Sequence, residues 1–193
     1  MWQKVYNSDY AVTLSSLPDL KSYPISSDNT QITLDSTSKE ITYGDSITLK
    51  ASVTSDTPQT VTWKSSNTAV ATVKDGVVTA TGKGTAKITA SLPNGRSAVC
   101  TVKVTTKKLP TSGYSYASTA QYTGSAIIPT VTVKDGSKVL RQNIDYRVIV
   151  TNNVKIGHAN ITISGMGNYY GSYTSGFDII PAKQTIYKLE TRY

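Results

Sequence analysis

Short runs in which apolar and polar residues alternate follow one another along most of the chain. The clearest run places Ile47, Leu49, Ala51 and Val53 on one face, with polar residues between them. Alternation with a period of two is typical of half-buried strands. Turn residues separate the runs at close intervals, and long helical stretches rich in Leu, Glu and Ala are missing. The pattern therefore predicts an all-β fold with almost no helix.

Asp75 and Gly76 mark a tight hairpin turn. They lie between the apolar-rich segments 70–73 and 77–80, and an Asp-Gly pair in that position is a strong hairpin signal. Gly82 and Gly84 indicate a further tight turn before the next alternating run. Many short strands joined by such turns are typical of a β-sandwich.

The length of the chain fits two such sandwiches. A sandwich of this kind takes about 100 residues, and the chain has 193. We expect an N-terminal arm at residues 1–29, a first immunoglobulin-like domain at 30–106, a linker at 107–113, a second sandwich at 114–183 and a tail at 184–193. Pro110 is expected to stiffen the linker and to hold the two domains at a nearly fixed angle.

Large side chains within the alternating runs are expected to fill the two cores. Trp63 is expected to be largely buried between the sheets of the first domain, because a large aromatic side chain fills much of a small core. The other predicted core residues are Val73 in the first domain, and Tyr146, Ile163 and Tyr169 in the second.

The first 29 residues are too apolar for an idle tail and too rich in proline and serine for an independent domain. Either the arm packs on the first sandwich, or it attaches the protein to a neighbouring subunit. The residues predicted to bind a partner are Trp2, Tyr6, Tyr10, Leu14, Leu17 and Leu20.

Tyrosine is concentrated in the second half of the chain. The stretch at 167–173 combines Tyr with Gly, Asn and Ser, as binding loops do, because Tyr offers a large amphipathic surface at a low entropic cost. Tyr170 and Tyr173 are therefore candidate ligand-binding residues, and a cell-surface polysaccharide is one candidate ligand.

Residues needed for catalysis or metal binding are scarce. One cysteine, Cys100, excludes an intrachain disulfide, and its place in an alternating run predicts a buried apolar role. One histidine, His158, cannot build a zinc site with a single cysteine, and the acidic residues lack the spacing of a calcium loop. We expect no enzyme activity, no metal and no cofactor.

The net charge of +8 first suggests a polyanionic partner. The basic residues are spread singly along the predicted strands instead of forming a stripe, so no specific nucleic-acid partner is expected. Such lysines discourage edge-to-edge strand pairing. No apolar stretch approaches the ~20 residues that span a bilayer.

Specific strings of residues run through both halves. The first half carries WKSSN at 63–67, VATV at 70–73, GVVTA at 76–80, Gly84 and ITA at 88–90. Over residues 31–105 this combination resembles the bacterial immunoglobulin-like group 2 (BIG2) domain. The second half carries YTGSAIIPTVTV at 122–133, Asp145-Tyr146 and ITISGMGNY at 161–169. It resembles another small sandwich repeat of bacterial surface proteins, often found in tandem with BIG2 domains.

The resemblances imply a structural or display protein, and three hypotheses follow. The first is a bacteriophage virion protein, a capsid decoration or tail-associated subunit that is attached through its arm and displayed on the virion surface. An initiating Met1 without a signal peptide fits this hypothesis. The second is a fragment of a secreted bacterial adhesin or stalk, located outside the cell or on its surface. The third is an accessory module of a carbohydrate-active enzyme. An oligomer is possible in each case.

Overall fold

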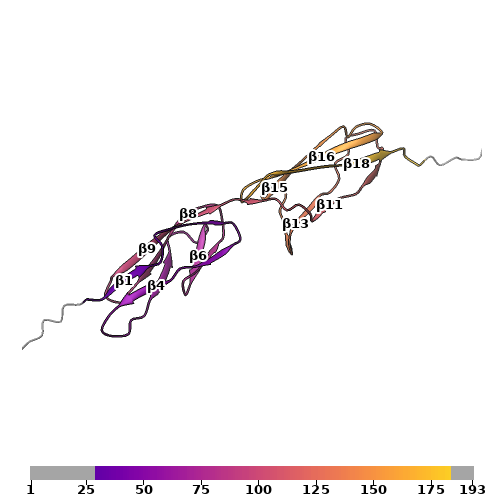
Figure 1. The fold of residues 1–193 in the computed structure, drawn as a ribbon. Helices are drawn as coiled ribbons and strands as arrows, with labels where there is room; N and C mark the ends of the chain where they lie inside the picture. Colours follow the sequence, from indigo (N-terminus) through magenta and orange to yellow (C-terminus); the bar gives the residue numbers. More distant parts are fainter. Residues whose placement is uncertain (1–28, 184–193) are drawn as a thin grey trace, which may run out of the picture.

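The computed structural model describes residues 29–183, and the predicted binding residues of the arm lie outside this range. The described residues form strands and turns without a helix, as two β-sandwiches in series, and the predicted all-β fold is confirmed. Figure 1 shows the sandwiches end to end in an elongated molecule, with the start of β1 near one end and the end of β18 near the other. The described residues include no helix with the length and apolarity needed to cross a membrane.

The first domain has nine strands. They are β1 (Gln31–Leu34), β2 (Ser38–Thr42), β3 (Ser46–Thr48), β4 (Ala51–Thr54), β5 (Thr62–Ser65), β6 (Ala71–Lys74), β7 (Val77–Ala80), β8 (Gly84–Ser91) and β9 (Ser97–Thr105). One sheet has the order β2-β9-β8-β5 and another β3-β7-β6, while β1 pairs with β4. The pairing of β2 with β9 is parallel.

The predicted hairpin is confirmed, because β6 and β7 pair antiparallel with Lys74 opposite Val77. Asp75 and Gly76 both have positive φ, at 49° and 81°, as the favoured two-residue hairpin turn requires. A Cβ on Gly76 would lie 2.6 Å from the Leu49 carbonyl and 3.2 Å from the Trp63 ring. Only glycine allows the turn to close this tightly onto the core.

The second domain also has nine strands. They are β10 (Lys107–Lys108), β11 (Tyr114–Ser115), β12 (Thr119–Gln121), β13 (Thr132–Asp135), β14 (Lys138–Val139), β15 (Tyr146–Thr151), β16 (Gly157–Gly165), β17 (Tyr169–Tyr170) and β18 (Ser172–Ile180). The main sheet has the order β12-β18-β16-β15, with β12 parallel to β18. A smaller sheet has the order β11-β13-β14.

Each domain encloses its own core. Trp63 is partly buried and packs against both apolar clusters of the first domain, and Val73 is partly buried against the larger one. Ile163 is fully buried in the second core. Tyr146 is buried there too, with its hydroxyl donating to the Val131 carbonyl at 2.8 Å. Cys100 is buried in the first core, and burial raises the pKa of its thiol.

The segment expected to be a linker is part of the second domain's structure. Lys107 and Lys108 form β10, which pairs with β17, and Leu109 is buried in the second core. The Tyr114 hydroxyl donates to the Pro110 carbonyl at 2.6 Å. Thr106 alone separates β9 from β10.

We predict that Trp63→Ala lowers the free energy of unfolding of the first domain by about 3 kcal/mol, the lower end for a truncated core aromatic, because Trp63 is only partly buried. Urea denaturation followed by tyrosine fluorescence measures this change. Val99→Ala, which shortens an exposed apolar side chain on β9, is the control and should cost less than about 0.5 kcal/mol. Equal losses in the two variants would contradict the role given to Trp63.

Candidate functional site: the junction between the two domains

The chain that leaves the first domain immediately joins the edge of the second. β10 runs parallel to β17, with Lys107 beside Tyr169 and Lys108 beside Tyr170. The Lys107 amide donates to the Asn168 carbonyl at 2.9 Å, and the Leu109 amide donates to the Tyr170 carbonyl at 2.8 Å. The connection is therefore held by backbone hydrogen bonds at both ends of β10.

Asn168 reaches across to the first domain. Its side-chain oxygen accepts a hydrogen bond of 2.7 Å from the amide of Lys83, which lies in the turn between β7 and β8. The same residue thus bonds β10 through its carbonyl and the first domain through its side chain.

Two tyrosines, one from each domain, meet beside this bond. Tyr43 follows β2, and its ring packs edge-to-face on that of Tyr169 with centroids 5.6 Å apart and planes at 81°. Lys138 of the second domain donates to the Tyr43 hydroxyl. Its ammonium lies 4.8 Å from the Tyr43 ring centroid. Because the nitrogen sits at the hydroxyl, the hydrogen bond contributes more here than any contact with the ring face.

Asp135 ties β10 to the second domain by a side-chain network. Its carboxylate accepts from the Lys107 ammonium at 2.7 and 3.0 Å and from the Tyr169 hydroxyl at 3.1 Å. Burial by itself would raise the pKa of Asp135. The bonds from Lys107 and Tyr169, with the charges of Lys107 and Lys138, outweigh it and hold that pKa below its ordinary value.

The pKa shifts fix the pH range in which this network stabilises the protein. A carboxyl with a lowered pKa contributes stability above its unfolded pKa of ~3.9 and loses it as the pH falls through the folded value. Burial and the Asp135 carboxylate raise the pKa of Tyr169, so its contribution is lost only as the pH rises above ~10. The network is complete between these limits.

The surface of the junction has an open hollow of about 310 Å³. Its lining combines residues of both domains: Tyr43, Gly44, Ala80, Thr81, Lys107, Asp135, Lys138 and Tyr169. The carboxylate and both ammonium groups already have partners within the network, and the lining has no Ser, Cys or His nucleophile or base. The arrangement fits a structural contact between the two domains.

Elsewhere in residues 29–183, no three His, Cys, Asp or Glu side chains lie close enough together to hold a metal ion. His158 is the second residue of β16, where its Nδ1 lies 2.8 Å from the Asp178 carboxylate. Both side chains are largely exposed, as in a surface pair.

The two candidate tyrosines differ in their surroundings. Tyr173 stacks on Tyr114 with ring centroids 4.0 Å apart and packs against the second core, so one face of its ring is occupied. Tyr170 is 52% exposed and lies beside Lys108 at the junction.

The residues of the junction were not predicted from the sequence. They are Tyr43, Lys83, Lys107, Asp135, Lys138 and Asn168.

Comparison with known proteins places the first domain in a family. Residues 28–102 match the family model of the bacterial Ig-like domain (group 2). The first domain is a group 2 bacterial Ig-like domain. The predicted resemblance is confirmed for this domain by both its sequence and its sandwich fold.

A lacto-N-biosidase from Bifidobacterium bifidum is 57% identical to the chain over 51 residues, which are 26% of this chain and 5% of that protein. The chain therefore spans only a small part of its curated relative.

The solved structures to which the chain is similar share little sequence with it. A tandem pair of titin Ig domains is 13% identical, covers 81% of this chain and 96% of its own, and gives a TM-score of 0.33. The Yersinia pseudotuberculosis adhesin InvE is 14% identical, with 78% and 59% covered and a TM-score of 0.34. The extracellular cadherin domains of protocadherin gamma B7 are 12% identical, with 78% and 50% covered and a TM-score of 0.33.

We predict that Asn168→Ala speeds hydrogen exchange of the Lys83 amide by at least about tenfold, because that amide loses its acceptor across the junction. Exchange followed by NMR measures the change. Asn153→Ala is the matched control, since Asn153 bonds backbone within the second domain, at its far end, and should leave Lys83 unaffected. An unchanged Lys83 amide in Asn168→Ala would show that the domains are not joined there.

Proposed function

We propose that the chain is a non-catalytic spacer of a protein on the bacterial surface or secreted from the cell, in which two sandwiches are held at a fixed angle. The observation that carries this proposal is the junction. An aromatic contact and a hydrogen bond join the two domains, while backbone pairing and a charged network hold the connecting strand β10. Mobile domains would need a free linker instead.

The match of the first domain to the bacterial Ig-like domain (group 2) supports a structural role. Sandwiches in series suit a stalk that separates what is joined at its two ends. In this chain, β1 and β18 lie near opposite ends of the molecule (Figure 1). A stiff spacer of this shape transmits position and orientation over the length of both domains.

We predict that Tyr43→Ala combined with Asn168→Ala uncouples the domains without unfolding either. The substitutions remove the edge-to-face contact and the bond to Lys83, while β10 remains paired with β17. Backbone ¹⁵N relaxation should show one common rotational diffusion tensor in the unsubstituted protein and shorter, separate correlation times in the variant.

The matched control is Tyr122→Ala combined with Asn153→Ala, which removes the same residue types at the far end of the second domain. This control should keep the common tensor. Independent tumbling of the domains in the unsubstituted protein would contradict the spacer role.

Two more specific roles can be proposed for the spacer, one within an enzyme and one on a virion. The 51-residue match to a lacto-N-biosidase favours an accessory module of a carbohydrate-active enzyme. The apolar composition of the arm favours attachment to a repeated lattice, such as a phage virion, because a segment that orders on binding can wrap a partner over a long path.

Deletion of residues 1–27 separates these two roles. If the arm is the attachment segment, the truncated protein should keep the unfolding temperature of both domains but no longer bind the particle, as measured by co-sedimentation. Alanine substitution of Trp2 and Tyr6 alone should weaken binding in the same direction. Full binding by the truncated protein would refute attachment through the arm.

A further inference from the structure

The two domains close their C-terminal ends in the same way. In each, a short strand runs parallel to the last strand, β2 beside β9 and β12 beside β18. A tyrosine follows the short strand and donates its amide to the last residue of the long one, Tyr43 to Thr105 at 2.9 Å and Tyr122 to Ile180 at 2.8 Å. Tyr122 is thus the structural counterpart of Tyr43.

The neighbouring turns correspond as well. Gly84 begins β8 opposite Val104, and Gly157 begins β16 opposite Ile179, each one residue before the end of the long strand. Both glycines have an unusual positive φ, +147° and +131°. Counted back from these glycines, Lys83 corresponds to Ile156.

In the first domain this end is covered by the second domain, through Tyr43 on Tyr169 and Lys83 on Asn168. In the second domain, as far as residues 29–183 are concerned, the corresponding end carries exposed apolar residues. We call them the distal face: Tyr122 (37% exposed), Ile128 (70%), Val154 (50%), Ile156 (54%) and Ile180 (42%).

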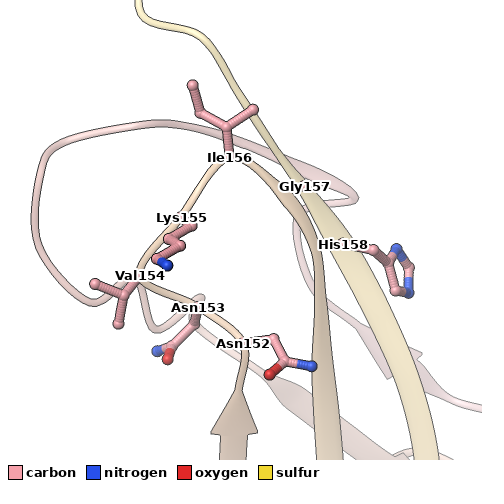
Figure 2. Close-up of a pocket in the computed structure, with 7 residues that line it drawn as sticks. All are labelled: Asn152, Asn153, Val154, Lys155, Ile156, Gly157 and His158. Atoms are coloured by element: carbon pink, nitrogen blue, oxygen red, sulfur yellow. The ribbon is translucent and has the colours of Figure 1, made fainter.

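Backbone contacts place these residues together. Ile156 precedes Gly157, which pairs with Ile179, so Ile156 lies beside the end of β18 and near Ile180. The Ile127 amide donates to the Asn153 carbonyl and the Asn153 side chain to the Ile127 carbonyl, both at 2.9 Å, which brings Ile128 next to Val154. Figure 2 shows Val154 and Ile156 projecting away from this loop, whose hollow measures about 410 Å³.

We propose that the distal face docks a further β-sandwich, joined behind β18, through the same contacts that seat the second domain on the first. The inference rests on the proposed spacer role and extends it. Tyr122 would take the place of Tyr43, and the Ile156 amide that of Lys83. Val154 and Ile156 occupy the positions that correspond to Thr81 and Lys83 at the existing junction. The distal face is therefore more apolar than the corresponding end of the first domain.

Other occupants fit less well. A second copy of this chain cannot supply the matching surface, because the N-terminal end of its own second domain is covered by its first domain. A polysaccharide is recognised by stacking on aromatic rings, and the distal face offers only Tyr122 among aliphatic side chains. A sandwich like the second domain brings the required Asn, Tyr and Lys side chains.

A graft that replaces residues 181–193 tests the proposal. A second copy of residues 106–183 is joined directly after Ile180, as residue 106 follows Thr105 in the natural chain. We expect the Ile156 amide to exchange at least about tenfold more slowly than in the ungrafted protein, and the third sandwich to tumble with the other two. Tyr122→Ala combined with Ile156→Ala, both made in the original second domain, should abolish both effects. Ile149→Ala, an exposed apolar change in the middle of β15, should abolish neither.

Each contrary result overturns the proposal in a recognisable way. If the third sandwich tumbles freely while the first two remain coupled, docking on the distal face is refuted and the spacer role remains. Free tumbling of all three refutes both. In the ungrafted chain, concentration-dependent shifts of the Val154 and Ile156 amide signals would assign the face to self-association. Shifts caused by purified cell-wall polysaccharide would assign it to a glycan.

Discussion

The pairing of β10 with β17 is the constraint on which the geometry of the molecule depends. Thr106 alone separates β9 from β10, so the second domain is held beside the first as soon as the two short strands pair. A connection this short gives the facing groups a high effective concentration. Weak contacts can then fix the angle between domains, although interfaces within a chain are usually small and polar.

The contacts at the junction differ in what they stabilise. An edge-to-face aromatic pair and a neutral hydrogen bond each contribute on the order of 1 kcal/mol, so Tyr43–Tyr169 and Lys83–Asn168 set the orientation only in combination. Asp135 acts indirectly, because it bonds Lys107 of β10 and the hydroxyl of Tyr169 and so holds both in place. The junction therefore depends on an ionised carboxylate, whose pKa is lowered by those same partners.

The fold could be predicted from the sequence because it depends on local patterns. Alternation identified the strands, and Asp75-Gly76 identified its hairpin, since both signals act within a few residues. The junction could not be predicted, because Tyr43, Asp135 and Asn168 are far apart in sequence and each is an ordinary turn or strand-end residue. The sequence predicts a linker at Lys107 and Lys108, since the pairing of two residues with a distant strand leaves no local pattern. The equivalence of Tyr43 and Tyr122 could not be predicted either, because it depends on the bond that each amide donates to the last residue of a distant strand.

The most direct test of the fixed junction is a distance distribution between the two domains. Nitroxide labels at Lys64→Cys on β5 and Arg147→Cys on β15 occupy exposed strand positions, while the native Cys100 is buried and protected from labelling. Double electron–electron resonance at neutral pH should give a single narrow distance distribution between these labels. A broad distribution, as wide as that of two sandwiches joined by a free linker, would contradict the account.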